Sequence, residues 1–290
     1  MPGENNWTVL TLLKKAESFF REKGIPSARL EAEILLAHVL GFDRVKLYTD
    51  FSRPVIPEEQ DRYRALIMRR ARGEPTAYLT GHKEFFSLDF QVTPHVLIPR
   101  PETEEMVQAA LDRIPDSGDG MRMADVGTGS GCIPVTLLKQ RPGLSAVALD
   151  LMPEALEVAS RNAELHGVTN RVRFLEGHLL EPLGSDRMDL ITCNPPYVDP
   201  RGEQPVDPDV KAFEPGRALF TPPGDPGFYY RELLDQAAPC LKPEGFLLLE
   251  LGAGLRQEVE SLALERGFSA KEVRSDLAGI ERVMVLELIL

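Results

Sequence analysis

From Met121 to the end of the chain, short apolar runs alternate with segments in which apolar residues recur at helical spacing. The runs of strand character are 122–126, 145–149, 172–175, 188–193, 246–251 and 283–288. The helical patterns between them are 133–140, 154–166, 227–238 and 255–266. Several runs are apolar at nearly every position, as in strands of a buried parallel sheet. The alternation predicts an α/β fold with a doubly wound sheet of Rossmann type.

Residues 1–74 have only helical patterns. Segments 7–23 and 28–40 are each followed by a glycine, as suits a helix C-terminal cap, and Ser27 stands at the N-cap position of the second. A third helix begins at Pro57, has glutamates in its first turn and ends in arginines, an order that matches the helix dipole. The arginines, Arg69, Arg70 and Arg72, stabilise the helix end or grip a partner.

The two regions are separated by residues 86–92, in which apolar and polar side chains alternate. This pattern predicts a half-buried strand that forms one arm of a hairpin. A chain of 290 residues exceeds the usual size of one domain. We therefore expect a helical substrate-docking domain at 1–74, a hairpin linker at 75–98 and the α/β domain at 99–290.

The net charge of −12 argues against a broad surface for nucleic acid, because such binding draws on many Lys and Arg contacts to phosphate. Residues 1–74 hold 13 basic against 11 acidic side chains, a net +2, whereas residues 75–290 carry −14. Only the first segment can offer a basic face. We expect no stable nucleic-acid binding and a monomer.

No run of eighteen apolar residues and no secretory signal is present in the sequence, so we expect a cytoplasmic protein that binds no membrane. The three cysteines, Cys132, Cys193 and Cys240, are far apart and have no metal-site spacing. They are interpreted as buried, reduced thiols, and no metal is expected.

A glycine-rich turn follows the first strand of the α/β region, where it lets a ligand approach the backbone closely. The candidate residues for binding a nucleotide-like ligand are Asp125, Gly127, Thr128, Gly129, Ser130 and Gly131. The sixth position of the dinucleotide fingerprint is Cys132, which disfavours NAD. Asp125 is placed to orient the loop or to meet the ligand. A plain tight connection is the alternative.

Asp150 ends the next strand, where an acidic side chain accepts hydrogen bonds from ribose hydroxyls. It also suits the N-cap of the helix that starts near Pro153, and the two roles are compatible.

The strand at 188–193 runs directly into Asn194-Pro195-Pro196-Tyr197, at the sheet edge where ligands bind. An amide nitrogen is a poor nucleophile. An Asn194 side-chain oxygen and a Pro195 carbonyl that accept its two N–H bonds orient it and favour the positive charge that develops during attack on a methyl group. The prolines restrict the turn, and the Tyr197 ring is placed to stack over the amide. A simple Pro-Pro strand terminator is the alternative.

The Asn-Pro-Pro-Tyr motif resembles that of the amino-methyltransferases, which include adenine-specific DNA methyltransferases and release factor glutamine methyltransferases. The runs Gly81 to Phe90 and Val96-Leu-Ile-Pro-Arg-Pro-Glu-Thr-Glu104 resemble the second group, the PrmC or HemK family. Further agreement comes from Glu214 to Leu219, Gly245 to Glu250 and Glu281 to Val283. The resemblance covers almost the whole chain.

The resemblance implies a class I methyltransferase that uses S-adenosylmethionine to methylate the glutamine of the Gly-Gly-Gln motif in bacterial class 1 release factors. Gly127 to Gly131 and Asp150 would bind the cofactor, and Asn194 to Tyr197 would hold the glutamine. The segment Pro99 to Glu104 lies against the active site in that family, which makes Arg100 and Glu102 candidate substrate contacts. Its pattern is also that of a helix start.

The sequence departs from the family pattern after the third strand. The family commonly has an Asp and an aromatic residue there, near the adenine, whereas this chain has Gly177-His178-Leu179. Leu179 can cover the adenine face by apolar contact, and His178 is a hydrogen-bonding candidate or a solvent-facing residue.

Two other functions compete with this interpretation. An adenine-specific DNA or RNA methyltransferase would hold the amine of a flipped base with the same motif, but the acidic α/β domain and the lack of a large basic segment speak against it. A cofactor-binding module without activity leaves Asn194 to Tyr197 without a purpose.

Overall fold

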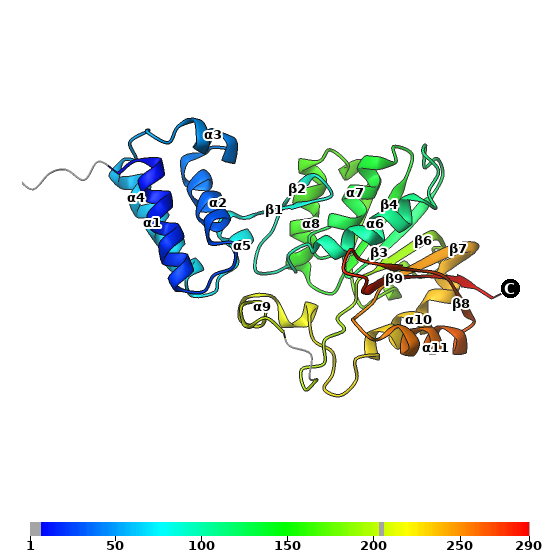
Figure 1. Cartoon of the computed structure of the whole chain (residues 1–290). Helices are drawn as coiled ribbons and strands as arrows, with labels where there is room; N and C mark the ends of the chain where they lie inside the picture. The colour runs from blue at the N-terminus through cyan, green and yellow to red at the C-terminus, as the bar shows by residue number, and fades with distance from the viewer. Residues whose placement is uncertain (1–6, 203–205, 290) are drawn as a thin grey trace, which may run out of the picture. The chain divides into compact units, whose positions relative to one another are not determined.

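The computed structural model describes residues 7–202 and 206–289, and its contacts divide the chain into two compact units (Figure 1). The helical unit contains the described residues up to Gly81 together with Asp207–Phe213. The α/β unit contains the described residues from His82 to Val206 and from Glu214 onward. The chain therefore crosses from one unit to the other three times.

The helical unit consists of α1 (Val9–Glu22), α2 (Ala28–Leu40), α3 (Arg44–Thr49), α4 (Pro57–Arg70), α5 (Thr76–Thr80) and α9 (Pro208–Phe213). Its core consists mainly of aliphatic and aromatic side chains from α1, α2 and α4, including Leu13, Phe20, Leu36 and Tyr63. The sequence analysis missed α3 and α5, which are only five or six residues long. Helix α9 is tied to α4 by an ion pair between Arg70 and Asp209 at 3.2 Å.

The predicted N-cap at Ser27 is wrong in one respect. Helix α2 does begin after Ser27, but this residue has a left-handed backbone with a φ of 52° and its side chain caps nothing. An N-cap residue normally has an extended backbone, which lets its side chain turn back to the first free N–H groups. Thr8 has that geometry and caps α1.

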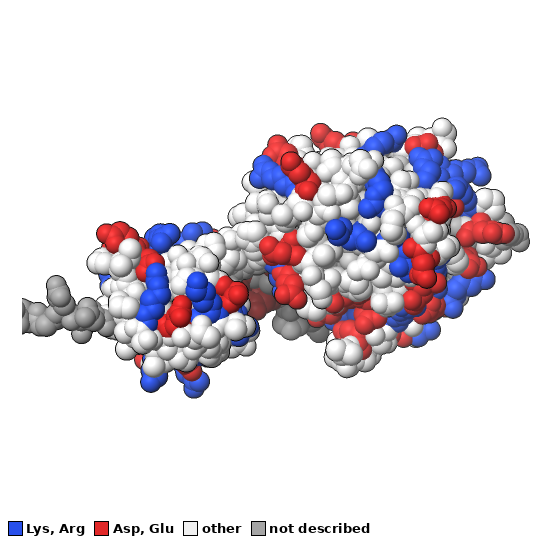
Figure 2. Space-filling model, turned by 90° about the horizontal axis from the view of Figure 1, so that it is seen from above, with Lys and Arg blue, Asp and Glu red and all other residues white. Residues whose placement is uncertain are grey.

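The arginines of α4 are bound within the helical unit. Arg69 donates to Glu74 at 2.7 Å and 2.5 Å, and Arg70 pairs with Glu31 at 3.0 Å as well as with Asp209. Figure 2 shows basic and acidic side chains interspersed on the visible face of the unit. For Arg69 and Arg70, the stabilising role is therefore the one that the structure supports.

The α/β unit is built on a seven-stranded sheet with the order β5-β4-β3-β6-β7-β9-β8. The strands are β3 (Arg122–Val126), β4 (Ser145–Asp150), β5 (Val172–Glu176), β6 (Met188–Cys193), β7 (Leu241–Glu250), β8 (Phe268–Ser275) and β9 (Glu281–Leu288). The strands from β5 to β7 are parallel, whereas β9 and β8 are antiparallel to their neighbours. The sequence analysis missed β8, because its polar residues do not form an apolar run.

Helices cover both faces of this sheet, as the doubly wound prediction requires (Figure 1). One face packs against α6 (Glu104–Leu111), α7 (Cys132–Gln140) and α8 (Pro153–Leu165), and the other against α10 (Phe228–Cys240) and α11 (Arg256–Glu265). The short 3-10 helices are η1 (Pro101–Thr103), η2 (Thr169–Arg171), η3 (Glu181–Leu183) and η4 (Gly216–Ala218). The helix start predicted at Pro101 is confirmed by η1, which runs directly into α6.

The predicted strand at 86–92 is the second arm of a hairpin, but its first residues are the turn. Strands β1 (His82–Phe85) and β2 (Leu88–Gln91) are joined by Phe86 and Ser87, whose φ angles are 49° and 59°. The hairpin packs on α8, where buried Asn162 accepts from the Gln91 N–H at 2.8 Å and donates to the carbonyls of Gln91 and Ser130. One amide thus ties the hairpin to the glycine-rich turn.

The three cysteines are buried and free, as predicted. In the described part of the chain, no helix is both long and apolar enough to cross a membrane. Within the same residues, no cluster of His, Cys, Asp or Glu is arranged to hold a metal ion.

Gly131→Ala should destabilise the fold more than Gly120→Ala. Both glycines have positive φ, 76° and 73°, so alanine adds a backbone cost of about 1–2 kcal/mol at either site. At Gly131 the new Cβ would also lie 3.0 Å from the Ala159 Cβ on α8, whereas at Gly120 it meets nothing within 4 Å. We expect a further loss of about 1–3 kcal/mol at Gly131 in the free energy of unfolding in urea. Equal losses would contradict close packing at Gly131.

Candidate active site

A cavity of about 350 Å³ lies at the carboxyl ends of the parallel strands. It is lined by the turns after β3, β4, β5 and β6, by the segment from His95 to Arg100, and by η4. All of these residues belong to the α/β unit. The cavity is therefore at the edge where ligands bind in doubly wound sheets.

The turn after β3 presents backbone to the cavity. Gly127 and Gly129 have φ angles of 68° and 54°, and a side chain on either would have only a backbone oxygen at 4.0 Å as its nearest neighbour. The turn is held by a bond from the Thr128 N–H to the Leu149 carbonyl at 2.9 Å. Gly131 does not line the cavity, because its place is against Ala159. The glycines thus divide between close ligand approach and helix packing.

Asp150 lies at the end of β4 and lines the cavity. Its carboxylate accepts from the Gly129 N–H and from the Met152 N–H, both at 2.9 Å. Burial raises the pKa of this carboxyl group, and the two N–H donors oppose that shift. The side chain therefore links the glycine-rich turn to the residues that precede α8.

Asp125 is buried in β3 behind the turn and is not among the residues that line the cavity. Its Oδ1 accepts from the Thr192 hydroxyl at 2.6 Å. Burial raises the pKa of Asp125 to about 7, and the hydroxyl groups of Thr192 and Thr128 oppose that shift. This position suits orientation of the loop rather than contact with a ligand.

Asn194, Pro195 and Pro196 line the cavity at the end of β6. The Asn194 Nδ2 lies 3.4 Å from the Thr103 hydroxyl, which also belongs to the lining. Tyr197 lies outside the lining, and its hydroxyl is 3.4 Å from the Glu250 carboxylate. The structure thus brings three of the four motif residues to the cavity and places the fourth behind them.

Arg100 lines the cavity, whereas Glu102 does not. The Arg100 guanidinium donates to buried Glu214 at 2.5 Å, and the other oxygen of Glu214 accepts from the Ile98 N–H at 3.1 Å. Glu214 therefore holds the segment before η1 in place from a position more than a hundred residues away in sequence.

The segment after β5 closes another side of the cavity. His178 and Leu179 both line it, and Leu179 has an unusual left-handed backbone with a φ of 48°. Such strain in a non-glycine residue occurs where the surroundings fix the backbone, often at binding sites. His178 lies 3.6 Å from Glu232 on α10.

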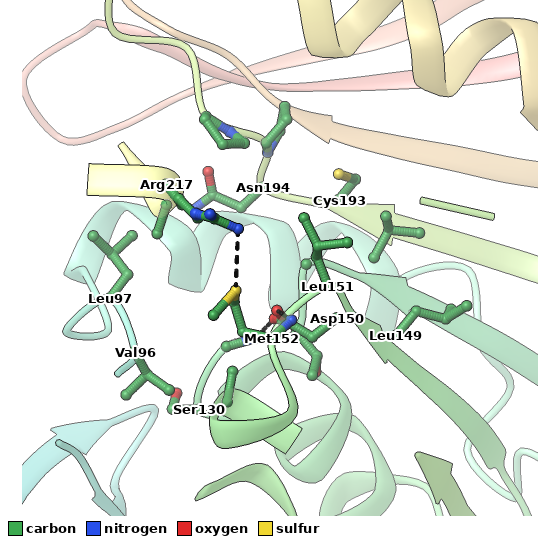
Figure 3. A pocket seen from close by; sticks show the side chains of 18 of the residues that line it. Val96, Leu97, Ser130, Leu149, Asp150, Leu151, Met152, Cys193, Asn194 and Arg217 are labelled. Carbon is green, nitrogen blue, oxygen red and sulfur yellow. Dashed lines mark hydrogen bonds between the residues drawn. The ribbon is translucent and has the colours of Figure 1, made fainter. Parts of the chain in front are cut away.

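Several lining residues were not predicted as site residues, among them Val96, Leu97, Leu151, Met152 and Arg217. The first two lie in the segment on which the family resemblance rested, and the next two directly follow Asp150. Arg217 reaches across to Met152, with 3.7 Å between its Nη1 and the sulfur (Figure 3). The spacing of residues in the sequence did not predict that the basic side chain of Arg217 would line the cavity.

Known proteins share both parts of this chain. Residues 11–81 match the PrmC N-terminal domain, and residues 105–207 match the methyltransferase small domain. The chain is 43% identical to the release factor glutamine methyltransferase of Geobacter sulfurreducens, with 96% of each chain covered. It is 40% identical to that of Chlorobaculum tepidum, over 97% of this chain and 98% of the other. The chain belongs to the release factor glutamine methyltransferase family.

Solved structures agree with this family's fold. A methyltransferase from Pyrococcus furiosus matches with a TM-score of 0.52 at 19% identity, over 77% of this chain and 96% of that one. The ribosomal protein L11 methylase of Lactobacillus delbrueckii subsp. bulgaricus matches with a TM-score of 0.50 at 18% identity, over 71% and 88%. These likenesses confirm the predicted class I methyltransferase fold of the family member described here.

The buried Asp125 should make the stability of this family member depend on pH. The pKa of Asp125 is about 7 in the folded protein, above the ordinary value of 3.8. Below about pH 4 the carboxyl group is protonated in both the folded and the unfolded state, so the protein keeps its full free energy of unfolding. That free energy falls as pH rises to about 7, because the unfolded state then loses the proton more readily. The isosteric variant Asp125→Asn should not lose stability in this way, because its amide does not titrate. Relative to wild type, its free energy of unfolding should rise by about 2–4 kcal/mol between pH 4 and pH 7 and then level off.

Urea titrations at several pH values measure this difference. Asp116→Asn is the control, because the Asp116 side chain is fully exposed. A difference between Asp125→Asn and wild type that does not change with pH would contradict a protonated Asp125 in the folded protein.

Proposed function

We propose that this protein transfers a methyl group from S-adenosylmethionine to the side-chain amide nitrogen of the glutamine in the Gly-Gly-Gln motif of class 1 release factors. The observation that carries the proposal is the meeting of Asn194-Pro195-Pro196 with the glycine-rich turn at one cavity. The relatives are release factor glutamine methyltransferases, which supports the choice of release factors as substrate.

The residues that line the cavity fit the chemistry of the cofactor. Gly127 and Gly129 leave their backbone open to a close ligand, and the polar side chains of Thr128 and Asp150 line the cavity beside them. Asp150 would hold the ribose, and Leu179 would cover the adenine face. When bound, S-adenosylmethionine supplies an activated methyl group on its sulfonium.

The chain's contribution to the transfer is to orient the amide. The Asn194 side-chain oxygen and the Pro195 carbonyl would accept the two N–H bonds of the glutamine amide, which aims the nitrogen lone pair and stabilises the positive charge that develops on it. Arg100 lies at the same cavity as a candidate substrate contact, whereas Glu102 would have to act from outside the lining. Stacking of the Tyr197 ring over the amide stays a prediction.

The helical unit would act as the docking domain that selects a whole release factor. It has a charge balance different from that of the α/β unit, and it exposes large apolar side chains, Val45 at 73% and Tyr48 at 50% on α3. We further propose that the protein works as a monomer in the cytoplasm and forms no stable complex with nucleic acid.

Radiolabelled methyl transfer tests the function directly. We expect label on unmethylated release factor, no label on its Gly-Gly-Gln→Gly-Gly-Asn variant and no label on unmethylated DNA. A docking role for the helical unit predicts a much higher kcat/KM for the whole release factor than for a short Gly-Gly-Gln peptide. Label on DNA alone would mean that the motif serves a nucleobase, and equal values for peptide and protein would remove the docking role.

Asn194→Ala and Asp150→Ala should separate substrate positioning from cofactor binding. Loss of the Asn194 amide is expected to lower kcat by about a hundredfold or more, with the cofactor Kd within about twofold of wild type. Loss of the Asp150 carboxylate is expected to weaken cofactor binding by about tenfold or more, because the proposed hydrogen bonds from the ribose hydroxyls are lost. Titration calorimetry and transfer rates measure the two effects. Wild-type turnover in Asn194→Ala, or wild-type affinity in Asp150→Ala, would sink the corresponding assignment.

A further inference from the structure

Glu250 is a buried acidic residue that the proposed reaction does not yet use. It ends β7, is only 2% exposed, and follows Leu249, which pairs with Cys193 on neighbouring β6. Since the strands are parallel, Glu250 and Asn194 come at the same level of the sheet edge. The carboxylate therefore lies directly behind the Asn-Pro-Pro-Tyr motif.

Two hydroxyl groups meet this carboxylate. The Thr103 hydroxyl donates to Oε2 at 2.7 Å, and the Tyr197 hydroxyl lies 3.4 Å from Oε1. Burial raises the pKa of the Tyr197 phenol, so this group stays protonated and can only donate toward a carboxylate. Glu250 thus receives a donor from η1 and a donor from the last residue of the motif.

The direction of these hydrogen bonds, from donor to acceptor, decides the orientation of the Asn194 side-chain amide. An ionised carboxylate is an acceptor only, so the single hydroxyl proton of Thr103 must be directed at Glu250. The Thr103 oxygen can then only accept from Asn194, which must turn its Nδ2 toward Thr103, as the 3.4 Å contact has it. That leaves the Asn194 Oδ1 for a different partner, the role that the glutamine amide N–H requires.

We propose that Glu250 is a positioning residue that, through Thr103, fixes the side-chain amide of Asn194 with its oxygen available to the substrate and, through Tyr197, holds the other end of the motif. This inference rests on the proposed function, because it assigns a polarity to a substrate contact of that reaction. Glu250 touches neither the glutamine nor the cofactor in this scheme.

The charge state of Glu250 should therefore control the rate. Burial raises its pKa to about 7, while the Thr103 hydrogen bond lowers it. Of the other groups around it, Arg282 on β9 favours the ionised form and Glu102 on η1 opposes it. Tyr197, Tyr230, Cys132 and Cys193 are further titratable groups that interact with Glu250. A protonated Glu250 can donate to Thr103, which then can donate to Asn194, so one amide orientation is no longer selected.

The pH profile of kcat/KM on the release factor tests this control between about pH 6 and about pH 8.5. Wild-type activity should rise through an apparent pKa near 7, where Glu250 ionises. Glu250→Gln should lose this rise, because its amide does not titrate. Glu265→Gln is the matched control, because it makes the same change at an exposed glutamate on α11, and that variant should keep the rise. A flat wild-type profile, or a rise that persists in Glu250→Gln, overturns the proposal.

Thr103 offers a second test that does not depend on a buried charge. Thr103→Val keeps the shape and removes the hydroxyl, so kcat/KM should fall about tenfold, as for one lost hydrogen bond, with cofactor affinity unchanged by calorimetry. Thr103→Ser restores the hydroxyl and should restore the rate. A Val variant as active as wild type, a Ser variant as weak as Val, or a parallel loss of cofactor affinity overturns the proposal. Absence of methyl transfer by wild type would instead refute the proposed function.

Discussion

The parallel pairing of β3 with both β4 and β6 is the constraint on which the candidate site depends. Val126 pairs with Leu149 on one side and with Cys193 on the other, so three strands end at one level. Asp150 is the last residue of β4, and the glycine-rich turn and Asn194 come directly after β3 and β6. Residues that are tens of positions apart in sequence therefore meet at one cavity. Strand register thus sets the spacing of the glycine-rich turn, Asp150 and Asn194 at the cavity.

The sequence was most informative where a residue's role depends on its own strand. Asn194 and Asp150 were predicted at the sheet edge because each follows an apolar run, and both line the cavity. Contacts between distant segments were not readable in the same way. Thr103 and Glu250 are 147 residues apart, and no spacing rule connects them. The wrong N-cap at Ser27 has a similar cause, because its left-handed backbone is not encoded by residue type alone.

Polar groups behind the cavity organise the groups that line it. Glu214 holds Ile98 and Arg100, and Asn162 holds the hairpin and the glycine-rich turn. Each of these side chains is buried and satisfies backbone or charged donors, so removing one partner leaves an uncompensated polar group. Family membership gives the reaction its class, while these contacts hold the segment before η1 and the glycine-rich turn at the cavity.

Helix α9 has a consequence for how the chain folds during synthesis. The helical unit leaves the ribosome first, but Asp209, the partner of Arg70, is made 139 residues later. By then, most of the α/β unit, the Asn-Pro-Pro-Tyr motif included, has already been made. The helical unit is therefore completed only once Phe213 has been made, and a chain cut after Gly81 would separate α9 from the helices on which it packs. The two units are therefore linked by three chain connections rather than one.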